Sequence, residues 1–250
     1  MASRTLKERF DRFVKDIGLP IIEAIERVVV RYSPHGDPSF FDPDDFAWTD
    51  LLESNWTTIR EELDAVLEHR DRLPNFQDIS EDQQSITKDD NWKTFFLYGF
   101  GYKAETNCSL APRTTEVVEQ IPGMKTAFFS ILSPGKHIPA HRGPYKGVVR
   151  AHLGLKVPEP REQCRIRVGD EVRHWEKGEV MIFDDTHDHE VWNDTDGERV
   201  VLFLDVERPL DPPMNVINRA IITLIGWSPL VQNAKANQET WEDRLENAMA

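Results

Sequence analysis

The chain has 250 residues, of which 39% are hydrophobic and 30% charged, so it is long enough for one large domain or a domain with helical extensions. Its formal net charge of -14 argues against nucleic acid or an anionic membrane surface as the main partner. Two cysteines are too few for a disulfide framework, and neither a signal peptide nor a membrane-spanning stretch is recognisable, so we expect a cytoplasmic protein. Membrane contact is not expected from these features, and the oligomeric state stays open.

Residues 1–91 are expected to form an N-terminal helical extension. Hydrophobic residues recur at helical spacing from Leu6 to Ile17 and again from Ile21 to Val28, with Pro20 kinking or dividing the helix. Residues 33–45 are rich in Pro, Asp and Ser and are expected to form a loop.

A second helix is expected from Asp50 onward. Apolar residues from Leu52 to Val66 form one helical face, and Asp50 with Glu53 resembles a capping box at its start. Residues 72–91 have little apolar content and are expected to form a loop.

Residues 92–208 change to a β pattern, in which short strand-like runs alternate with Gly, Pro and Asp clusters. Close spacing of this kind predicts an antiparallel sandwich or barrel, interrupted by one helix at about 113–120. Residues 209–250 turn helical again and are expected to pack on the core as one structural unit. The predicted strands are Thr94–Tyr98, Thr126–Leu132, Val148–Leu155, Arg165–Val168, Glu179–Phe183, Glu190–Trp192 and Arg199–Val206.

Two histidines follow cupin-type spacing. His141 lies six residues after Gly135, as in the first cupin motif, and His189 lies between Gly178 and Asn193 at the spacing of the second. Either half-match is weak, but both in order favour a double-stranded β-helix, that is, a jelly-roll or cupin-like fold. His141 and His189 are then the expected metal ligands, because imidazole with open positions suits iron that binds oxygen.

Two neighbouring positions qualify this assignment. Gly143 stands where the first cupin motif has its second histidine, and it offers no carboxylate for the usual site of two histidines and one acid. His187 shares a strand face with His189, so parity cannot choose between them. Cupin spacing selects His189, and a solvated role is expected for His187.

Strand parity also suggests a binding cradle. Side chains two apart share a face, so Ser130, Arg150, His152 and Arg199 can all project into the barrel beside the metal. Two arginines, a serine and a histidine suit a small dicarboxylate. The alternative is that the arginines are buried partners of Asp184 or Asp205. Trp92 and Trp192 are also expected near this site.

Five motifs within residues 92–208 resemble the aspartyl/asparaginyl β-hydroxylase family, which consists of Fe(II)- and 2-oxoglutarate-dependent dioxygenases. The resemblance implies His141 and His189 as iron ligands, and it implies Ser130 with Arg199 at the distal carboxylate of 2-oxoglutarate. It places Arg150 and His152 near the metal-proximal end of the cosubstrate, and it implies that Asp185 orients a metal-bound water. The motifs are Phe129–Gly135, His141–Pro144, Arg150–Leu155, Phe183–Asp185 with His189–Trp192, and Arg199 before Asp205–Val206.

The resemblance implies hydroxylation of an unactivated C–H bond with O2 and 2-oxoglutarate. The first expectation for the substrate is the β-carbon of an aspartyl or asparaginyl residue in an amino acid or peptide. A bacterial branch acts on the acyl chain of lipid A, so a lipid A or other acyl substrate is the alternative, and Arg167–Arg173 looks closer to that branch. A non-catalytic jelly-roll binding or sensing protein is the alternative of another class. Selectivity is expected from residues 72–91 and the terminal helices, because iron and cosubstrate occupy the barrel residues.

Overall fold

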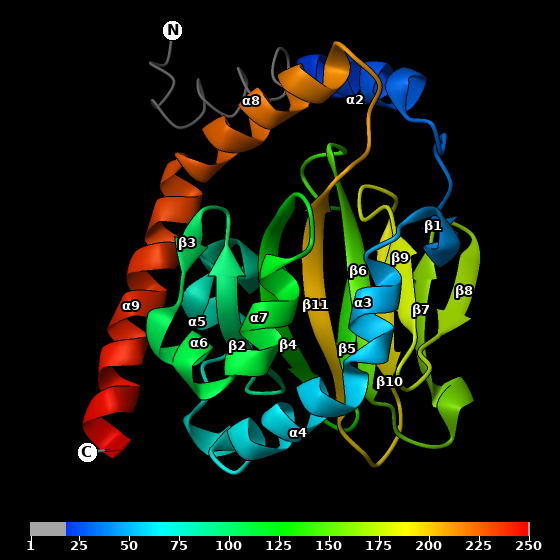
Figure 1. The fold of residues 1–250 in the computed structure, drawn as a ribbon. Helices are drawn as coiled ribbons and strands as arrows, with labels where there is room; N and C mark the ends of the chain where they lie inside the picture. The colour runs from blue at the N-terminus through cyan, green and yellow to red at the C-terminus, as the bar shows by residue number, and fades with distance from the viewer. Residues whose placement is uncertain (1–18, 250) are drawn as a thin grey trace, which may run out of the picture.

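Two antiparallel β-sheets packed face to face form the centre of the protein (Figure 1). The computed structural model describes residues 19–249, so the helix expected within residues 6–17 lies outside the described part. The larger sheet has seven strands in the order β1-β9-β6-β11-β4-β2-β3, and the smaller has four in the order β5-β10-β7-β8. This pair of sheets confirms the predicted β-rich jelly-roll class with flanking helices.

The seven-stranded sheet consists of β1 (Phe40–Phe41), β2 (Trp92–Gly99), β3 (Tyr102–Lys103), β4 (Met124–Leu132), β6 (Val148–Lys156), β9 (Val180–Phe183) and β11 (Arg199–Glu207). The four-stranded sheet consists of β5 (His137–His141), β7 (Cys164–Val168), β8 (Glu171–His174) and β10 (His189–Asn193). All seven predicted strands are present. The sequence reading missed β1, β3, β5 and β8.

Each face of the large sheet packs against a different partner. Val149, Ala151 and Leu153 of β6 belong to the core beneath the helices, whereas Phe128 of β4 and Phe203 of β11 belong to the core between the two sheets. Because successive strand residues alternate in direction, Arg150 and His152 face the space between the sheets, as the parity argument predicted. Apolar burial on both faces fixes this register, since a one-residue slip would exchange the two sets of side chains.

Helices cover the outer face and the ends of the sandwich. The helix expected from Asp50 is divided in two, at Asn55, and its predicted capping box is absent. Glu53 instead accepts a hydrogen bond from the backbone nitrogen of Val180 in β9, at 2.8 Å. The helices are α2 (Leu19–Tyr32), α3 (Thr49–Ser54), α4 (Trp56–Leu67), α5 (Phe76–Ile79), α6 (Glu105–Leu110), α7 (Pro112–Glu119), α8 (Met214–Gly226) and α9 (Pro229–Met249).

Residues 72–91 are more ordered than a plain loop. They contain α5, a 3-10 turn at Glu81–Ser85 and a capping box between Asn75 and Asp78. Short elements of this kind lack the apolar periodicity by which a longer helix is recognised.

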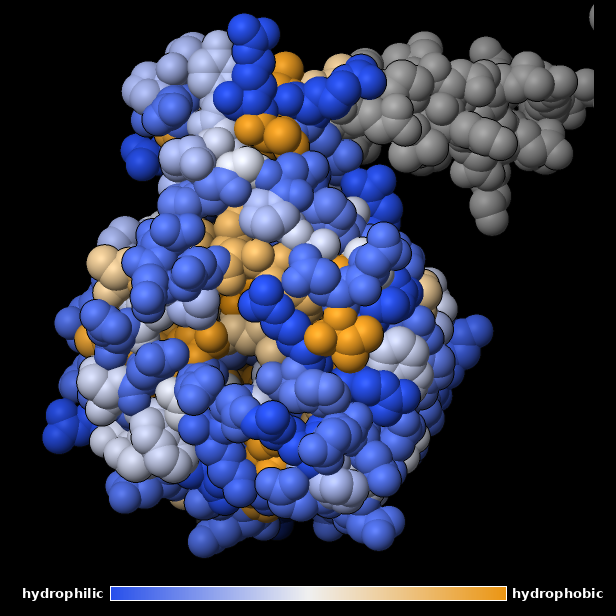
Figure 2. Space-filling model, turned by 90° about the vertical axis from the view of Figure 1, so that its right-hand side faces the viewer, coloured by the Kyte–Doolittle hydropathy of each residue, from blue (hydrophilic) through white to orange (hydrophobic). Residues whose placement is uncertain are grey.

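Helices α2 and α8 lie together at one end of the sandwich, above the strands, and α9 continues from there along its side (Figure 1). Within residues 19–249 no single helix is long and apolar enough to cross a membrane; α8 and the first part of α9 pass such a test only as a pair bent by 55°. On the face shown in Figure 2, most of the surface is hydrophilic and apolar surface gathers in a recess below the projecting upper part.

Candidate active site

The two predicted metal ligands lie side by side on neighbouring strands. His141 ends β5, His189 begins β10, and the two residues are paired across the strands with ring centroids 4.1 Å apart. Nδ1 of His141 lies 2.8 Å from the carbonyl of Pro139, and Nδ1 of His189 lies 3.0 Å from the carbonyl of His187. Since a carbonyl only accepts hydrogen bonds, each Nδ1 carries the proton and each Nε2 keeps a lone pair for a metal.

Both imidazoles are neutral. Burial lowers the pKa of His141, and burial together with His141 and Arg150 lowers the pKa of His189 to about 3. Neutral rings can bind a metal ion without first losing a proton. Among the described side chains, no third His, Cys, Asp or Glu forms a three-membered ligand group with this pair.

The carboxylate of Asp185 fills the space that a side chain at Gly143 would need. A Cβ atom built on Gly143 would lie 2.0 Å from Oδ2 of Asp185, and the Gly143 nitrogen donates to the Asp185 carbonyl at 2.6 Å. Burial raises the pKa of Asp185 to about 6, against the opposing effect of Arg150, and its Oδ1 is buried without a hydrogen bond. The glycine therefore makes room for an acid that comes from another strand end.

Arg150 has acidic partners within the protein. Its Nη1 lies 2.9 Å from Oδ2 of Asp185, and its Nε donates to Oδ1 of Asp205 at 3.0 Å. The alternative expected from the sequence, a buried ion pair with Asp205, is therefore present at this arginine. Its guanidinium also lies 4.4 Å from the ring centroid of Phe203, between the two sheets.

Arg199 differs from Arg150 because its charge has no acidic partner. The residue is 1% exposed, and both Nε and Nη1 are buried without a hydrogen bond. No ion pair of Arg199 occurs among the described residues; its guanidinium carbon lies 4.6 Å from the ring centroid of Trp175, over the ring face. Burial lowers its pKa to about 10, so the group is still charged at neutral pH. A buried, unpaired guanidinium is costly unless an anion joins it.

His152 offers a second unused donor next to Arg199. Trp175 donates through Nε1 to Nδ1 of His152 at 3.2 Å. Burial and the nearby Arg199 and Arg150 lower the pKa of His152 well below its usual value, so the ring is neutral. Its remaining proton is then on Nε2, which is buried and has no hydrogen-bond partner.

Ser130 and the aromatic residues beside it close the inner end of this space. The indole nitrogen of Trp92 donates to the Ser130 hydroxyl at 3.0 Å, and both residues are buried. Phe76 of α5 packs on Trp92 and Phe128, with ring centroids 4.8 and 5.4 Å away. Residues from the 72–91 segment thus reach the space between the sheets, where we expected that segment to border the site.

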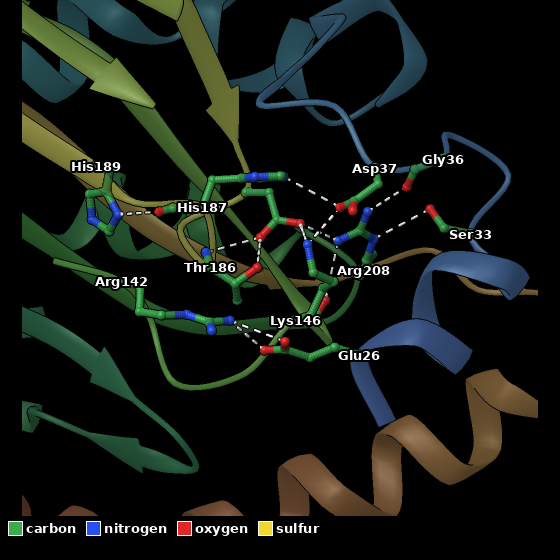
Figure 3. A network of polar contacts seen from close by, with 11 residues as sticks. Glu26, Ser33, Gly36, Asp37, Arg142, Lys146, Thr186, His187, His189 and Arg208 are labelled. Carbon is green, nitrogen blue, oxygen red and sulfur yellow. Dashed lines mark hydrogen bonds and ion pairs between the residues drawn. The ribbon is translucent and has the colours of Figure 1, made fainter. Parts of the chain in front are cut away.

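A network of ion pairs holds the two ligand-bearing turns together (Figure 3). Asp184 binds Lys146 at 2.9 Å and Arg208 at 2.6 Å, and it caps the turn through Thr186. Lys146 comes from the segment after His141, and the turn leads into His189, so one buried carboxylate ties both turns to each other. Burial alone would raise the pKa of Asp184, but the two cations outweigh it and lower the pKa.

Asp37, Asp184 and His187 have ligand atoms within 4.8 Å of one another, which raises the question of a second metal site. Lys146 contacts both carboxylates, at 2.6 Å from Asp37 and 2.9 Å from Asp184. The positive charges of Lys146 and Arg208 already neutralise this group, so we assign it as an ion-pair network.

Sequence reasoning missed Trp175 and misplaced Trp192. Trp175 joins Arg199 to His152, yet it lies in the segment between β8 and β9, where no motif marks it. Trp192 alternates with inward-facing Val191 on β10 and stacks on His137 at 5.5 Å, on the outer face of the small sheet. Trp92 does lie at the site, as expected.

Comparisons with known proteins agree with this arrangement. The family model described as aspartyl/asparaginyl beta-hydroxylase matches residues 53–209. The ornithine lipid ester-linked acyl 2-hydroxylase of Rhizobium tropici is 46% identical over 91% of this chain and 81% of its own length. The human aspartyl/asparaginyl beta-hydroxylase is 37% identical over 67% of this chain, which spans 22% of that longer protein.

Among solved structures, a Pseudomonas putida prolyl-4-hydroxylase aligns with a TM-score of 0.39 and 16% identity, covering 75% of this chain and 99% of that one. The family match extends over more than half of the sequence and includes the two histidines with Ser130, Arg150, His152, Asp185 and Arg199. The chain belongs to the aspartyl/asparaginyl β-hydroxylase family.

Proposed function

We propose that this protein is an Fe(II)- and 2-oxoglutarate-dependent hydroxylase whose substrate is the acyl chain of a membrane lipid. His141 and His189 would hold the iron, and Arg199, Ser130 and His152 would hold 2-oxoglutarate. Together, iron and cosubstrate supply the oxidation of an unactivated C–H bond by O2, with conversion of 2-oxoglutarate to succinate and CO2.

The observation that carries the cosubstrate assignment is the buried, unpaired guanidinium of Arg199. A carboxylate placed against it would gain a charge-assisted, two-pronged contact and remove the cost of an uncompensated charge. The Ser130 hydroxyl, two residues before the strand partner of Arg199, is close enough in register to share the same carboxylate. Arg199 and Ser130 together therefore form a binding site suited to one carboxylate of 2-oxoglutarate.

His152, Arg150 and Asp185 would donate or accept hydrogen bonds around the iron and the cosubstrate. Nε2 of His152 can donate to the metal-proximal end of the cosubstrate, since Trp175 fixes its tautomer. Arg150 is already neutralised by two aspartates, so we assign it to positioning Asp185. Asp185, with one free oxygen, can accept a hydrogen bond from a water on the metal.

Two observations support an acyl substrate over the amino-acid or peptide substrate that the sequence alone placed first. The likeness to the ornithine lipid hydroxylase is higher and longer, reaching 91% of the chain, than the likeness to the human enzyme at 67%. It therefore includes segments outside the family core, which are the segments expected to select the substrate. Aspartyl or asparaginyl substrates stay the second candidate, on the family likeness itself.

A parallel turnover assay tests the proposal. The Fe(II)-loaded protein would be given 2-oxoglutarate with an acylated ornithine lipid in detergent, or with an Asp- or Asn-containing peptide, and both succinate and product mass would be measured. We expect succinate and a product heavier by one oxygen with the lipid. Product formed from the peptide alone would reverse the order of the two substrates.

The same assay addresses the non-catalytic alternative. Binding of 2-oxoglutarate with no succinate formed under any condition would favour a sensing or binding protein. A matched control is the Arg199→Ala variant, in which both binding and turnover should fail together.

A further inference from the structure

Helix α8 carries large apolar side chains on both its inner and its outer face. Its inner face packs through buried Met214 and Ile222 against Val29 of α2 and Tyr145. Its outer side and the bend into α9 carry exposed large apolar side chains. These are Val216 (65% exposed), Ile217, Leu224 (62%), Trp227 (72%) and Leu230.

Another helix of the same protein shows the ordinary pattern. On α4 the inner positions Ile59 and Leu63 are buried, and the outer positions include Thr57, Glu61 and Asp64. A water-exposed helix usually carries such polar residues on its outer face, whereas a group of exposed large apolar side chains on one face marks a contact surface. The exposed face of α8 is therefore built for a partner.

The segment that carries this face is poor in acidic residues compared with the whole chain. Residues 212–238 contain no Asp or Glu, although the chain has 44 acidic residues and a net charge of -14. The adjacent helix α2 exposes Arg27 and Arg31, while its Glu26 is buried and bound to Arg142. Arg219 of α8 is paired with Glu207, so the two α2 arginines supply the local positive charge.

Both helices are fastened to the loop that follows His141. Arg142 donates to Glu26 of α2 at 2.8 Å (Figure 3), and Tyr145 donates to Asn218 of α8 at 2.7 Å. Asn218 in turn donates to the carbonyl of Gly147 at 2.8 Å. The exposed apolar face therefore belongs to helices that are hydrogen-bonded to the loop next to His141, a proposed iron ligand.

We propose that this surface docks on an anionic lipid bilayer. The docking face comprises Val216, Ile217, Leu224, Trp227 and Leu230, with Arg27 and Arg31 of α2 at the same end of the molecule. Its apolar side chains would enter the boundary between headgroups and acyl chains, with Trp227 at the interface and the arginines on lipid phosphates. The inference rests on the proposed function, because it explains how an acyl substrate would be met beside the iron site.

A bilayer fits this face better than a second copy of the chain. Two copies would each carry a charge of -14 and so repel each other outside the face. An anionic bilayer is attracted by the arginines and accepts the indole and aliphatic side chains. The acidic remainder of the molecule would be held off the membrane, which orients the docked protein.

Vesicle sedimentation tests the docking face without iron or 2-oxoglutarate. The whole chain would be mixed with vesicles of phosphatidylcholine alone or of phosphatidylcholine with phosphatidylglycerol. We expect binding to the mixed vesicles that is lowered at least about tenfold in Leu224→Ser/Trp227→Ser, since two large apolar side chains no longer enter the bilayer. Val172→Ser changes another exposed apolar residue, on β8 (52% exposed), and as the control it should bind like the parent.

Charge reversal tests the second part of the face. Arg27→Glu should weaken binding to the mixed vesicles several-fold and change binding to neutral vesicles little, whereas Arg113→Glu on α7 should leave both unchanged. All four variants should bind 2-oxoglutarate like the parent, so a failure of the cosubstrate site is seen separately.

Three results would overturn the docking face. They are no binding of the parent to mixed vesicles, equal loss in Val172→Ser and Leu224→Ser/Trp227→Ser, or a stable dimer of the parent that dissociates in Leu224→Ser/Trp227→Ser. If vesicle binding behaves as expected and 2-oxoglutarate does not bind the parent, the proposed function is wrong and the docking face stands.

Discussion

At the scale of single residues, the site is a set of buried polar groups whose protonation is set by burial. His141, His152 and His189 are neutral, Arg199 is charged without a partner, and Asp185 has a pKa of about 6. In a stable apolar interior such groups are expensive. Because so many of these groups lie between the two sheets, we infer that they serve ligand binding, at some cost in folding stability.

We expect His141→Ala or His189→Ala to abolish iron binding, because each ring is one of two protein ligands. The control is His187→Ala, which removes a ring that faces Asp37 and leaves the backbone carbonyl that orients His189. Metal content after anaerobic reconstitution gives the answer. Full iron occupancy in both ligand variants would show that the metal site lies elsewhere.

The raised pKa of Asp185 predicts an acid limb in the pH profile of turnover. Below about pH 6 the carboxyl is protonated and would no longer accept a hydrogen bond at the proposed metal site, so we expect turnover to fall. Asp185→Asn should be slow but should lack this limb.

Stability should change in the opposite direction with pH at the same group. The folded protein holds the Asp185 proton to higher pH than the unfolded chain does, so the free energy of unfolding should decrease as pH rises from about 4 to about 6. Urea unfolding of Asp185→Asn should lose that decrease. An unchanged pH slope in this variant would contradict the assigned pKa.

At the scale of elements, the site depends on two turns that the sequence does not mark as partners. The turn at residues 184–188 leads into β10, and the loop after His141 leads into β6. Asp184 binds Lys146 and Arg208 from outside its own turn and has no exposed surface. This carboxylate keeps the two histidines in register.

Asp184→Ala should therefore cost about 3–5 kcal/mol of unfolding free energy, because it leaves Arg208 buried without an acidic partner and Lys146 with Asp37 alone. The matched control is Asp188→Ala in the same turn, where the carboxylate is exposed and paired with Arg167. That change should cost no more than about 1 kcal/mol. Equal losses in both variants, measured by urea unfolding, would argue against the network.

The period-two pattern of the sequence predicted the long strands of the large sheet and the inward direction of Ser130, Arg150, His152 and Arg199. It did not predict β5, because Pro139 interrupts that run; β5 is an edge strand, where proline is tolerated. It did not predict β8 either, since three of its four residues are exposed and show no apolar alternation.

The period-two pattern also cannot show which side chains far apart in the sequence contact each other in the fold. Strand parity alone did not distinguish Arg150 from Arg199, and only the fold shows that Asp185 and Asp205 contact the first and not the second. The role of Trp175 was hidden for the same reason. The apparent capping box at Asp50 failed because Glu53 binds β9, which is 127 residues away in the chain.

At the scale of the whole molecule, binding and docking are divided between the barrel and its terminal helices. The barrel supplies the two histidines and the carboxylate cradle. Helices α2 and α8, at the end shown uppermost in Figure 1, carry the arginines and most of the exposed apolar side chains of the proposed docking face and are attached to the loop after His141. The net charge of -14 is a sum over the whole chain, so it did not indicate that residues 212–238 lack Asp and Glu.

The central claim is that the unpaired guanidinium of Arg199 binds the carboxylate of 2-oxoglutarate, and calorimetry of Arg199→Met tests it most directly. We predict that 2-oxoglutarate binding to this variant weakens at least about 30-fold, as expected for a lost contact worth about 2 kcal/mol or more. The ligand-free variant should be at least as stable as the parent, because a buried unpaired charge is replaced by an apolar side chain. Parent-like 2-oxoglutarate binding, together with a stability loss of about 3–5 kcal/mol, would contradict the account and assign Arg199 a structural role.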